Sequence, residues 1–228
     1  MKSRKIFPII AFIMVGTAIF ITLSVIVSSA NKEYVNEQSQ NNDTITSYNI
    51  TSVADLAIDN SDLKKMFDNS EYVAILTIDS IDGADNYSYI NHEYVFPYSF
   101  GSATIHNVYK GDFRDNDKIK FYRLGGTLPI DKYREGLGVS EKAKFDQLRK
   151  NDPNLESAET ITRSFKNDIK IDTGKTYLGF LVKDTTYNGD GLSFIGFEGG
   201  IRLIDGEKVL NNFTNEWEPL NDVTNKLQ

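Results

Sequence analysis

An uninterrupted apolar run near the N-terminus limits what this chain can fold into more than any other feature. The run begins at Ile6, ends at Val27 and contains no charged residue. At about 1.5 Å of rise per helical residue, about 20 apolar residues cross a hydrocarbon core roughly 30 Å thick. The run also lacks the polar stripe that a helix packed on a soluble core normally carries. The pattern therefore predicts one transmembrane helix at residues 6–27.

The charges that flank this run predict its orientation. Lys2, Arg4 and Lys5 precede it, whereas the residues that follow it have no excess of basic side chains. By the positive-inside rule, residues 1–5 stay in the cytoplasm and everything after the helix is exported. The lipid bilayer is therefore the first expected partner of the chain. The expected location is the cell membrane, crossed once, with the C-terminal domain outside.

A cleavage motif after the run leaves a second interpretation open. Ser28 and Ala30 are small residues at the two positions that a signal peptidase reads, so cleavage after Ala30 would release a secreted protein. The run is longer than the apolar region of an ordinary signal peptide, about 7–15 residues, which favours an uncleaved signal anchor. The chain has no cysteine, which excludes anchoring through a lipidated cysteine.

The exported part is acidic and has no cross-links. Residues 1–30 hold three of the 25 basic residues and none of the 32 acidic ones, which leaves 22 against 32 and a net charge of −10. Binding to nucleic acid requires clustered Lys and Arg, so this composition argues against it. Without cysteine the exported fold has no disulfides and depends on its own hydrophobic core. A domain of this size can bury a sufficient core.

The exported part divides into a tether and a folded domain. Residues 28–50 are polar and rich in Asn, Gln and Ser, which predicts a flexible tether. Residues 51–228 alternate β-rich segments with turn motifs, which predicts one extracytoplasmic domain. A charged stretch at about 127–168 lacks the β pattern and is interpreted as an insertion over one end of the sheet. It contains a helix at 141–150 that Ser140 caps.

The β-rich segments predict a mainly β fold, a small OB-like or Greek-key barrel with one short preceding helix. Ser61 is the expected N-cap of that helix, in which Leu63, Met66 and Phe67 share a face. Gly101 lies where the buried parity of a long strand changes, which predicts a bulge or sharp bend. The expected strands are residues 71–80, 94–109, 117–123, 175–183, 192–197, 201–204 and 208–210.

Turn and strand-edge motifs give the chain a resemblance to a known kind of domain. The motifs are NSEYVAIL at 69–76, NVYKGD at 107–112, LGG at 124–126, TGKTYLGFL at 173–181, EGG at 198–200 and DGE at 205–207. Over about residues 62–210 the chain resembles exported proteins of Gram-positive bacteria with an OB-like domain. That domain is related in shape to the netrin-like fold of tissue inhibitors of metalloproteinases. The resemblance implies a fold and no activity, because those inhibitors chelate zinc through an N-terminal cysteine that this chain lacks.

The titratable residues form no motif of catalysis or metal binding, so no catalytic residue, cofactor or metal ligand is expected. His92 and His106 are the only histidines, and a zinc site needs several converging ligands. Ser99 and Ser102 are close to His106 in sequence but lie outside any nucleophile-elbow motif.

The acidic clusters are interpreted as turns. Asp79, Asp82 and Asp85 lie among Gly, Asn and Ser, which is typical of a solvated turn. Residues 184–190 could offer oxygen ligands to calcium, but they lack the spacing and the closing Glu of a calcium loop. A tight hairpin is the favoured interpretation.

Trp217, the only tryptophan, is expected to pack on the barrel as a plug, or, if exposed, to serve as an interface anchor. Together these features predict a membrane-anchored extracytoplasmic binding or interaction module. Two alternatives remain. One is a secreted inhibitor or effector, if the chain is cleaved after Ala30. The other is a hydrolase with its site over residues 127–168, because long loops on rigid scaffolds often carry function.

Overall fold

The structure, a computed structural model, describes residues 46–53, 59–166 and 168–227. All of them belong to one compact unit, residues 36–228. The predicted transmembrane helix at 6–27, the cleavage motif at Ala30 and most of the predicted tether lie outside the described residues. Within the described ranges, no helix combines the length and the apolar character needed to cross a bilayer.

The described residues are 47% strand and 24% helix, which confirms the predicted mainly β class. In chain order the elements are β1 (Ser47–Ser52), α1 (Leu63–Asn69), β2 (Tyr72–Ser88), β3 (Glu93–Lys110), β4 (Lys118–Leu124), β5 (Gly126–Pro129), α2 (Ile130–Glu135), α3 (Val139–Asn151), α4 (Pro153–Glu156), β6 (Thr160–Phe165), β7 (Thr176–Lys183), β8 (Leu192–Phe194), α5 (Phe197–Gly200), β9 (Ile201–Asp205), β10 (Lys208–Asn211), β11 (Glu216–Pro219), α6 (Leu220–Thr224) and a 3₁₀ helix, η1 (Asn225–Leu227).

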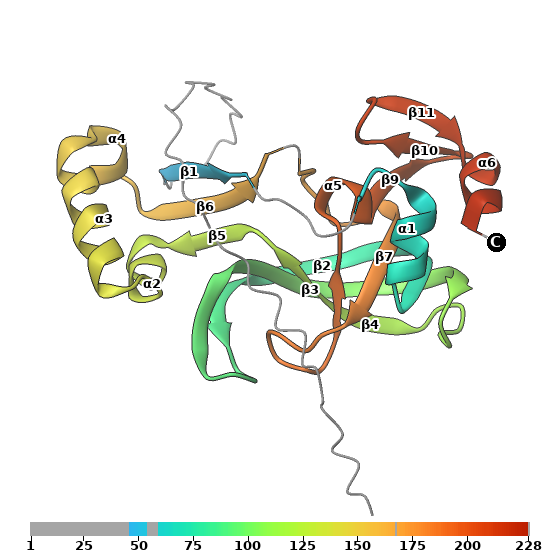
Figure 1. Cartoon of the computed structure of the whole chain (residues 1–228), viewed down its shortest axis with the longest axis horizontal. Helices are drawn as coiled ribbons and strands as arrows, with labels where there is room; N and C mark the ends of the chain where they lie inside the picture. The colour runs from blue at the N-terminus through green and yellow to red at the C-terminus, as the bar shows by residue number, and fades with distance from the viewer. Residues whose placement is uncertain (1–45, 54–58, 167, 228) are drawn as a thin grey trace, which may run out of the picture. The chain divides into compact units, whose positions relative to one another are not determined.

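Eight of these strands form a large sheet in the order β11-β10-β9-β7-β2-β3-β4-β8 (Figure 1). The strand β8 pairs in parallel with β4 and antiparallel with β7. The hydrogen-bonding path through β7, β2, β3, β4 and β8 therefore returns to β7. Beyond β7, the strands β9, β10 and β11 continue the sheet by antiparallel pairing.

The strand β2 is buried on both faces, as its run of apolar residues predicts. Leu76 and Ile78 lie in one hydrophobic cluster, with side chains from β3, β4, β7 and β9. Val73 and Ile75 lie in a second cluster, with Met66 of α1 and residues of α6 and η1. The helices α1 and α6 thus cover the outer face of β2 and β7, and this packing positions the chain's best candidate site.

The strand β3 changes its buried face at Gly101, where the sequence predicts a bend. Ala103 and Ile105 are fully buried on one side of this point, and Tyr98 is buried on the opposite parity. A Cβ on Gly101 would lie 2.0 Å from the backbone oxygen of Ser80, so only glycine fits. The two register shifts next to Gly101, between Ile78 and Ser80 and between Ile81 and Gly83, put the extra residue on the partner strand β2.

A smaller sheet with strand order β1-β6-β5 takes two of its strands, β5 and β6, from the two ends of the predicted insertion. The prediction that residues 127–168 lack β structure is therefore wrong. The sheet packs against α2, α3 and α4 around Leu128, Leu155 and Ile161. The alternation of apolar and polar residues in β6 is interrupted because Arg163 takes one of its inward positions. There Nη1 of Arg163 donates a hydrogen bond to the Tyr133 hydroxyl at 3.1 Å.

The last residues of the predicted tether are also ordered. Residues 47–50 belong to β1, which pairs in parallel with β6. Tyr48 and Ile50 pack against the cluster of the smaller sheet. The prediction failed because the partner strand lies more than 100 residues away, and six mostly polar residues give little local signal.

Two helices begin at other residues than the sequence predicts. The N-cap of α1 is Asp62 rather than Ser61, because Asp62 Oδ1 accepts from the Lys64 N–H at 2.9 Å. The helix α3 begins earlier than expected, with Gly138 rather than Ser140 at its N-cap. There the side chain of Glu141 accepts from the Gly138 N–H at 2.9 Å.

Candidate functional site

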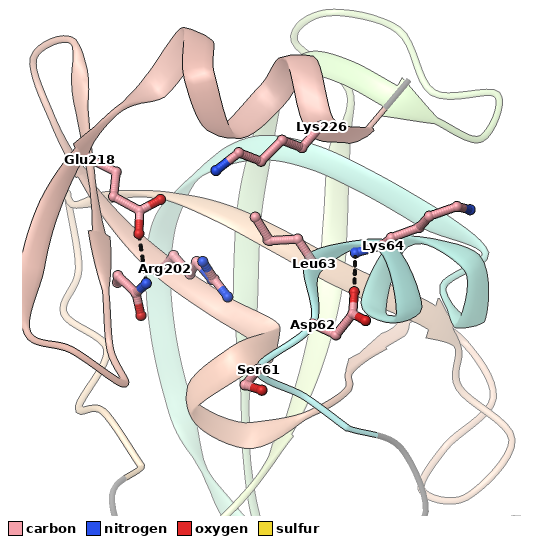
Figure 2. A pocket seen from close by; sticks show the side chains of 8 residues that line it. Ser61, Asp62, Leu63, Lys64, Arg202, Glu218 and Lys226 are labelled. Carbon is pink, nitrogen blue, oxygen red and sulfur yellow. Dashed lines mark hydrogen bonds between the residues drawn. The ribbon is translucent and has the colours of Figure 1, made fainter.

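A pocket of about 330 Å³ lies beside α1, where the sheet extension β9-β10-β11 and the C-terminal η1 meet (Figure 2). This is the low end of the volumes typical of small-molecule sites, about 300–1,000 Å³. The lining residues are mostly polar or charged: Ser61, Asp62, Leu63, Lys64, Arg202, Asn211, Glu218 and Lys226. The pocket thus joins segments that are far apart in sequence.

Arg202 is the unusual member of this lining, because its side chain is only 2% exposed. On β9 it pairs with Leu178 of β7, a residue of the outer apolar cluster. Its neighbour Ile201 belongs to the opposite cluster. The strand alternation therefore places a guanidinium group at the end of an apolar layer.

Two nitrogens of this guanidinium, Nε and Nη2, have no hydrogen-bond partner among the described residues. These nitrogens share one edge of the planar group, so their N–H bonds point in nearly the same direction. That edge is the fork by which arginine binds a carboxylate or phosphate with two parallel hydrogen bonds. Buried donors left without partners are costly, at about 1–3 kcal/mol each and more for charged groups. This edge of Arg202 is therefore buried and unpaired in the lining of the pocket.

Glu218, on the adjacent wall, influences Arg202 without pairing with it. Burial lowers the pKa of the Arg202 guanidinium, and the negative charge of Glu218 partly offsets this effect. The described residues include no ion pair between the two side chains. Glu218 Oε1 instead accepts a hydrogen bond from Asn211 Nδ2 at 2.6 Å, drawn as a dashed line in Figure 2.

The other charges of the lining differ in how they are held. Asp62 Oδ1 is engaged as the helix cap of α1. Lys64 forms a 2.8 Å ion pair with Asp68, one helical turn away. Lys226 is exposed, and Figure 2 shows its ammonium group pointing toward the side of the pocket that holds Glu218 and Arg202. The pocket therefore offers one buried cation, one exposed cation and one nearby carboxylate.

The start of β9 is fixed by two closely packed glycines, which the sequence suggested only as a bend. A Cβ on Gly199 would lie 2.0 Å from the backbone oxygen of Asn60. A Cβ on Gly200 would lie 1.3 Å from the backbone oxygen of Ile195. Both glycines end α5, directly before β9. Without side chains, Gly199 can approach the segment before α1 and Gly200 can approach the backbone of Ile195, which places the start of β9 beside the pocket.

The histidines and serines considered from sequence form no catalytic arrangement. His106 Nε2 lies 2.8 Å from the hydroxyl of Thr77, and His92 occupies a hairpin turn with φ of 56°. Ser102 bonds to a serine of β2, and Ser99 contacts a backbone carbonyl at 3.5 Å. Within the described residues, neither serine contacts a histidine.

The interpretation of Asp79, Asp82 and Asp85 as a solvated turn is wrong, because all three lie within the strand β2, where Asp85 is buried. Their carboxylates are nevertheless held apart. Asp79 accepts a hydrogen bond from Thr104 at 2.7 Å, and Asp85 lies 3.1 Å from the ammonium group of Lys132. Asp82 is exposed. Because each carboxylate has a separate environment, they form no acid and base pair.

The loop at residues 184–190 is organised by Asp184, which is 2% exposed. Its carboxylate accepts backbone N–H bonds from residues 186–189 at 2.8–3.3 Å. Burial raises the pKa of Asp184, but these donors outweigh it and lower the pKa below 3.8. Asp190 points instead to Lys120 and Tyr122. Across the described residues, no group of three or more His, Asp or Glu side chains is placed to hold a metal ion.

Trp217 lies on β11 and is 43% exposed. It belongs to none of the hydrophobic clusters of the described residues, which differs from the expected plug. Its role as an interface anchor stays a prediction.

Sequence reasoning missed Arg202 altogether. In the segment IRLID an arginine between two aliphatic residues is typical of a strand with one solvent-exposed face. Only the packing of α1 and η1 over that face reveals the burial. The chain matches no known protein family and no curated protein.

Proposed function

We propose that this protein is a membrane-anchored extracytoplasmic binding module that holds an anionic group of its ligand on Arg202. The apolar residues 6–27 and the basic residues before them support the anchor and its orientation. The acidic composition of the remaining chain suits a soluble head that is not drawn onto anionic lipid headgroups.

The order of the strands supports an OB-like barrel as the scaffold of this head. In chain order, β2, β3, β4, β7 and β8 lie around the closed hydrogen-bonding path as strands 1-2-3-5-4. This is the strand order of OB-fold barrels, which serve as binding scaffolds. Two strands of the smaller sheet, β5 and β6, and the helices α2, α3 and α4 fall between the third and fourth of these strands.

A single observation carries the binding function, namely that the buried guanidinium of Arg202 lines a pocket and has two unpaired nitrogens. A guanidinium ion in this position destabilises the empty protein, and a bound anion relieves the penalty. Arginine stays protonated at any physiological pH, so the site is permanently cationic. The arrangement thus favours an anion such as a carboxylate or phosphate.

The anchoring is tested with the full chain carrying a C-terminal tag and expressed in a bacterium. We expect the protein to stay with membranes after a carbonate wash and to begin before Ala30. Protease added to intact protoplasts should remove the tag. A protein in the medium that begins at Asn31 would establish the secreted alternative, and a protected tag would refute the orientation.

The binding is tested with the full chain in lipid nanodiscs. We expect acetate or inorganic phosphate to raise the unfolding temperature of the wild type and to leave the Arg202→Met variant unchanged. Ligand-dependent stabilisation follows the occupancy of the folded state. Equal responses of the two proteins would contradict the proposed site.

A further inference from the structure

Two opposite charges face the pocket without neutralising each other. Arg202 lines the pocket with a buried guanidinium whose Nε and Nη2 have no partner among the described residues, and Glu218 keeps Oε2 free of the hydrogen bond that occupies Oε1. Glu218 is close enough to raise the pKa of Arg202, yet no ion pair joins them within the described residues. A ligand that carries both charges would fit between them.

Glu218 is held in position by Asn211 rather than by a cation. Asn211 Nδ2 donates to Glu218 Oε1 at 2.6 Å, while Asn211 Oδ1 accepts from the Phe213 N–H at 3.0 Å. The amide is therefore fixed at both ends within the hairpin of β10 and β11. A fixed carboxylate binds an ammonium group with little loss of side-chain entropy.

We propose that the pocket binds a zwitterion of the α-amino acid class, with its carboxylate on Arg202 and its ammonium group on Glu218. This inference rests on the proposed binding function and specifies its ligand. The planar fork of Arg202 matches a carboxylate with two hydrogen bonds. The volume of about 330 Å³ accommodates a small molecule of this kind.

The same charges disfavour a phosphate. Inorganic phosphate carries more than one negative charge at neutral pH, and Glu218 would repel it in a partly desolvated site. The exposed ammonium group of Lys226 attracts the phosphate only weakly, because solvent and salt screen it, so it does not offset the repulsion by Glu218. A ligand with no net charge avoids this repulsion.

The test measures the affinity of the full chain in nanodiscs for glycine, acetate, methylammonium and inorganic phosphate by calorimetric titration. We expect glycine to bind at least about tenfold more tightly than acetate, which is the contribution of one charge-assisted hydrogen bond. Glu218→Gln should remove this advantage, because the ammonium group of glycine loses its carboxylate partner while acetate is no longer repelled by Glu218. Glu216→Gln, on the same strand but outside the pocket lining, is the matched control and should keep the advantage.

The outcomes separate this inference from the binding function. Equal affinities for glycine and acetate, both lost in Arg202→Met, would overturn the zwitterion and retain the anion site. Phosphate binding tighter than glycine would do the same. If no anion binds in a manner that depends on Arg202, both proposals fail.

Discussion

Replacement of Arg202 by methionine should stabilise the protein. The arginine buries two N–H groups without partners, and each costs about 1–3 kcal/mol. Methionine fills a similar volume with a flexible apolar chain and contacts the cluster around Leu178. Replacing buried charges with apolar side chains of similar size is often stabilising by about 1–4 kcal/mol. We therefore expect a gain of about 2 kcal/mol in the free energy of unfolding.

The assay is thermal unfolding of the full chain in nanodiscs, followed by circular dichroism and by the fluorescence of Trp217. For a domain of this size, 2 kcal/mol corresponds to a rise of about 4–8 °C in Tm. The gain in stability should accompany a loss of anion binding, as at other sites that trade stability for function.

Arg123 provides the matched control, because it is a largely buried arginine, 11% exposed, that has partners. Its Nη2 donates to the carboxylate of Asp168 and to the backbone oxygen of Ile169. Arg123→Met should destabilise the protein by about 3–5 kcal/mol, since it leaves a buried carboxylate without its cation. If Arg202→Met lowered Tm as Arg123→Met does, Arg202 would be a structural residue and the reasoning would be refuted.

Three further predictions concern the fold. Asp184→Asn should cost about 2–4 kcal/mol at neutral pH, because the carboxylate binds a run of backbone N–H groups. Because the pKa of Asp184 is lowered in the folded state, its contribution to the free energy of unfolding is complete above pH 3.8 and is lost as the pH falls further. The stabilities of the wild type and of Asp184→Asn should therefore converge in acid. A difference that stays constant with pH would contradict this. Gly101→Ala should cost about 3 kcal/mol or more in urea unfolding, because its Cβ would overlap the backbone of Ser80, and a neutral result would show that β2 can move. Trp217→Ala should change the stability by less than about 1 kcal/mol, as the ring is exposed, and a larger loss in thermal unfolding would restore the interpretation as a plug.

The strands of the large sheet could be predicted because their signals are local. The apolar runs that form β2 and β7 are long enough to exclude an exposed strand, and both are buried on two faces. The Asp-Gly pair at 205–206 turns β9 into β10, with Gly206 at a φ of 59°. In each case, neighbouring residues alone specify the structure.

The smaller sheet and the pocket could not be predicted because they depend on contacts between distant segments. The strand β1 is ordered by β6, and the inward Arg163 of β6 interrupts its apolar alternation. Arg202 becomes a site residue only because α1 and η1 cover a face that its own strand would leave exposed. Burial of this kind depends on tertiary packing and has no local sequence signal.

The most direct test of the account is the nuclear magnetic resonance signal of the Arg202 Nε–H group in the full chain. The signal is assigned by its absence from the spectrum of Arg202→Met. The account predicts that it shifts progressively as glycine is added and stops shifting when the pocket is saturated. A signal that stays unchanged with glycine, acetate and phosphate would contradict the claim that Arg202 is the binding group of a membrane-anchored module.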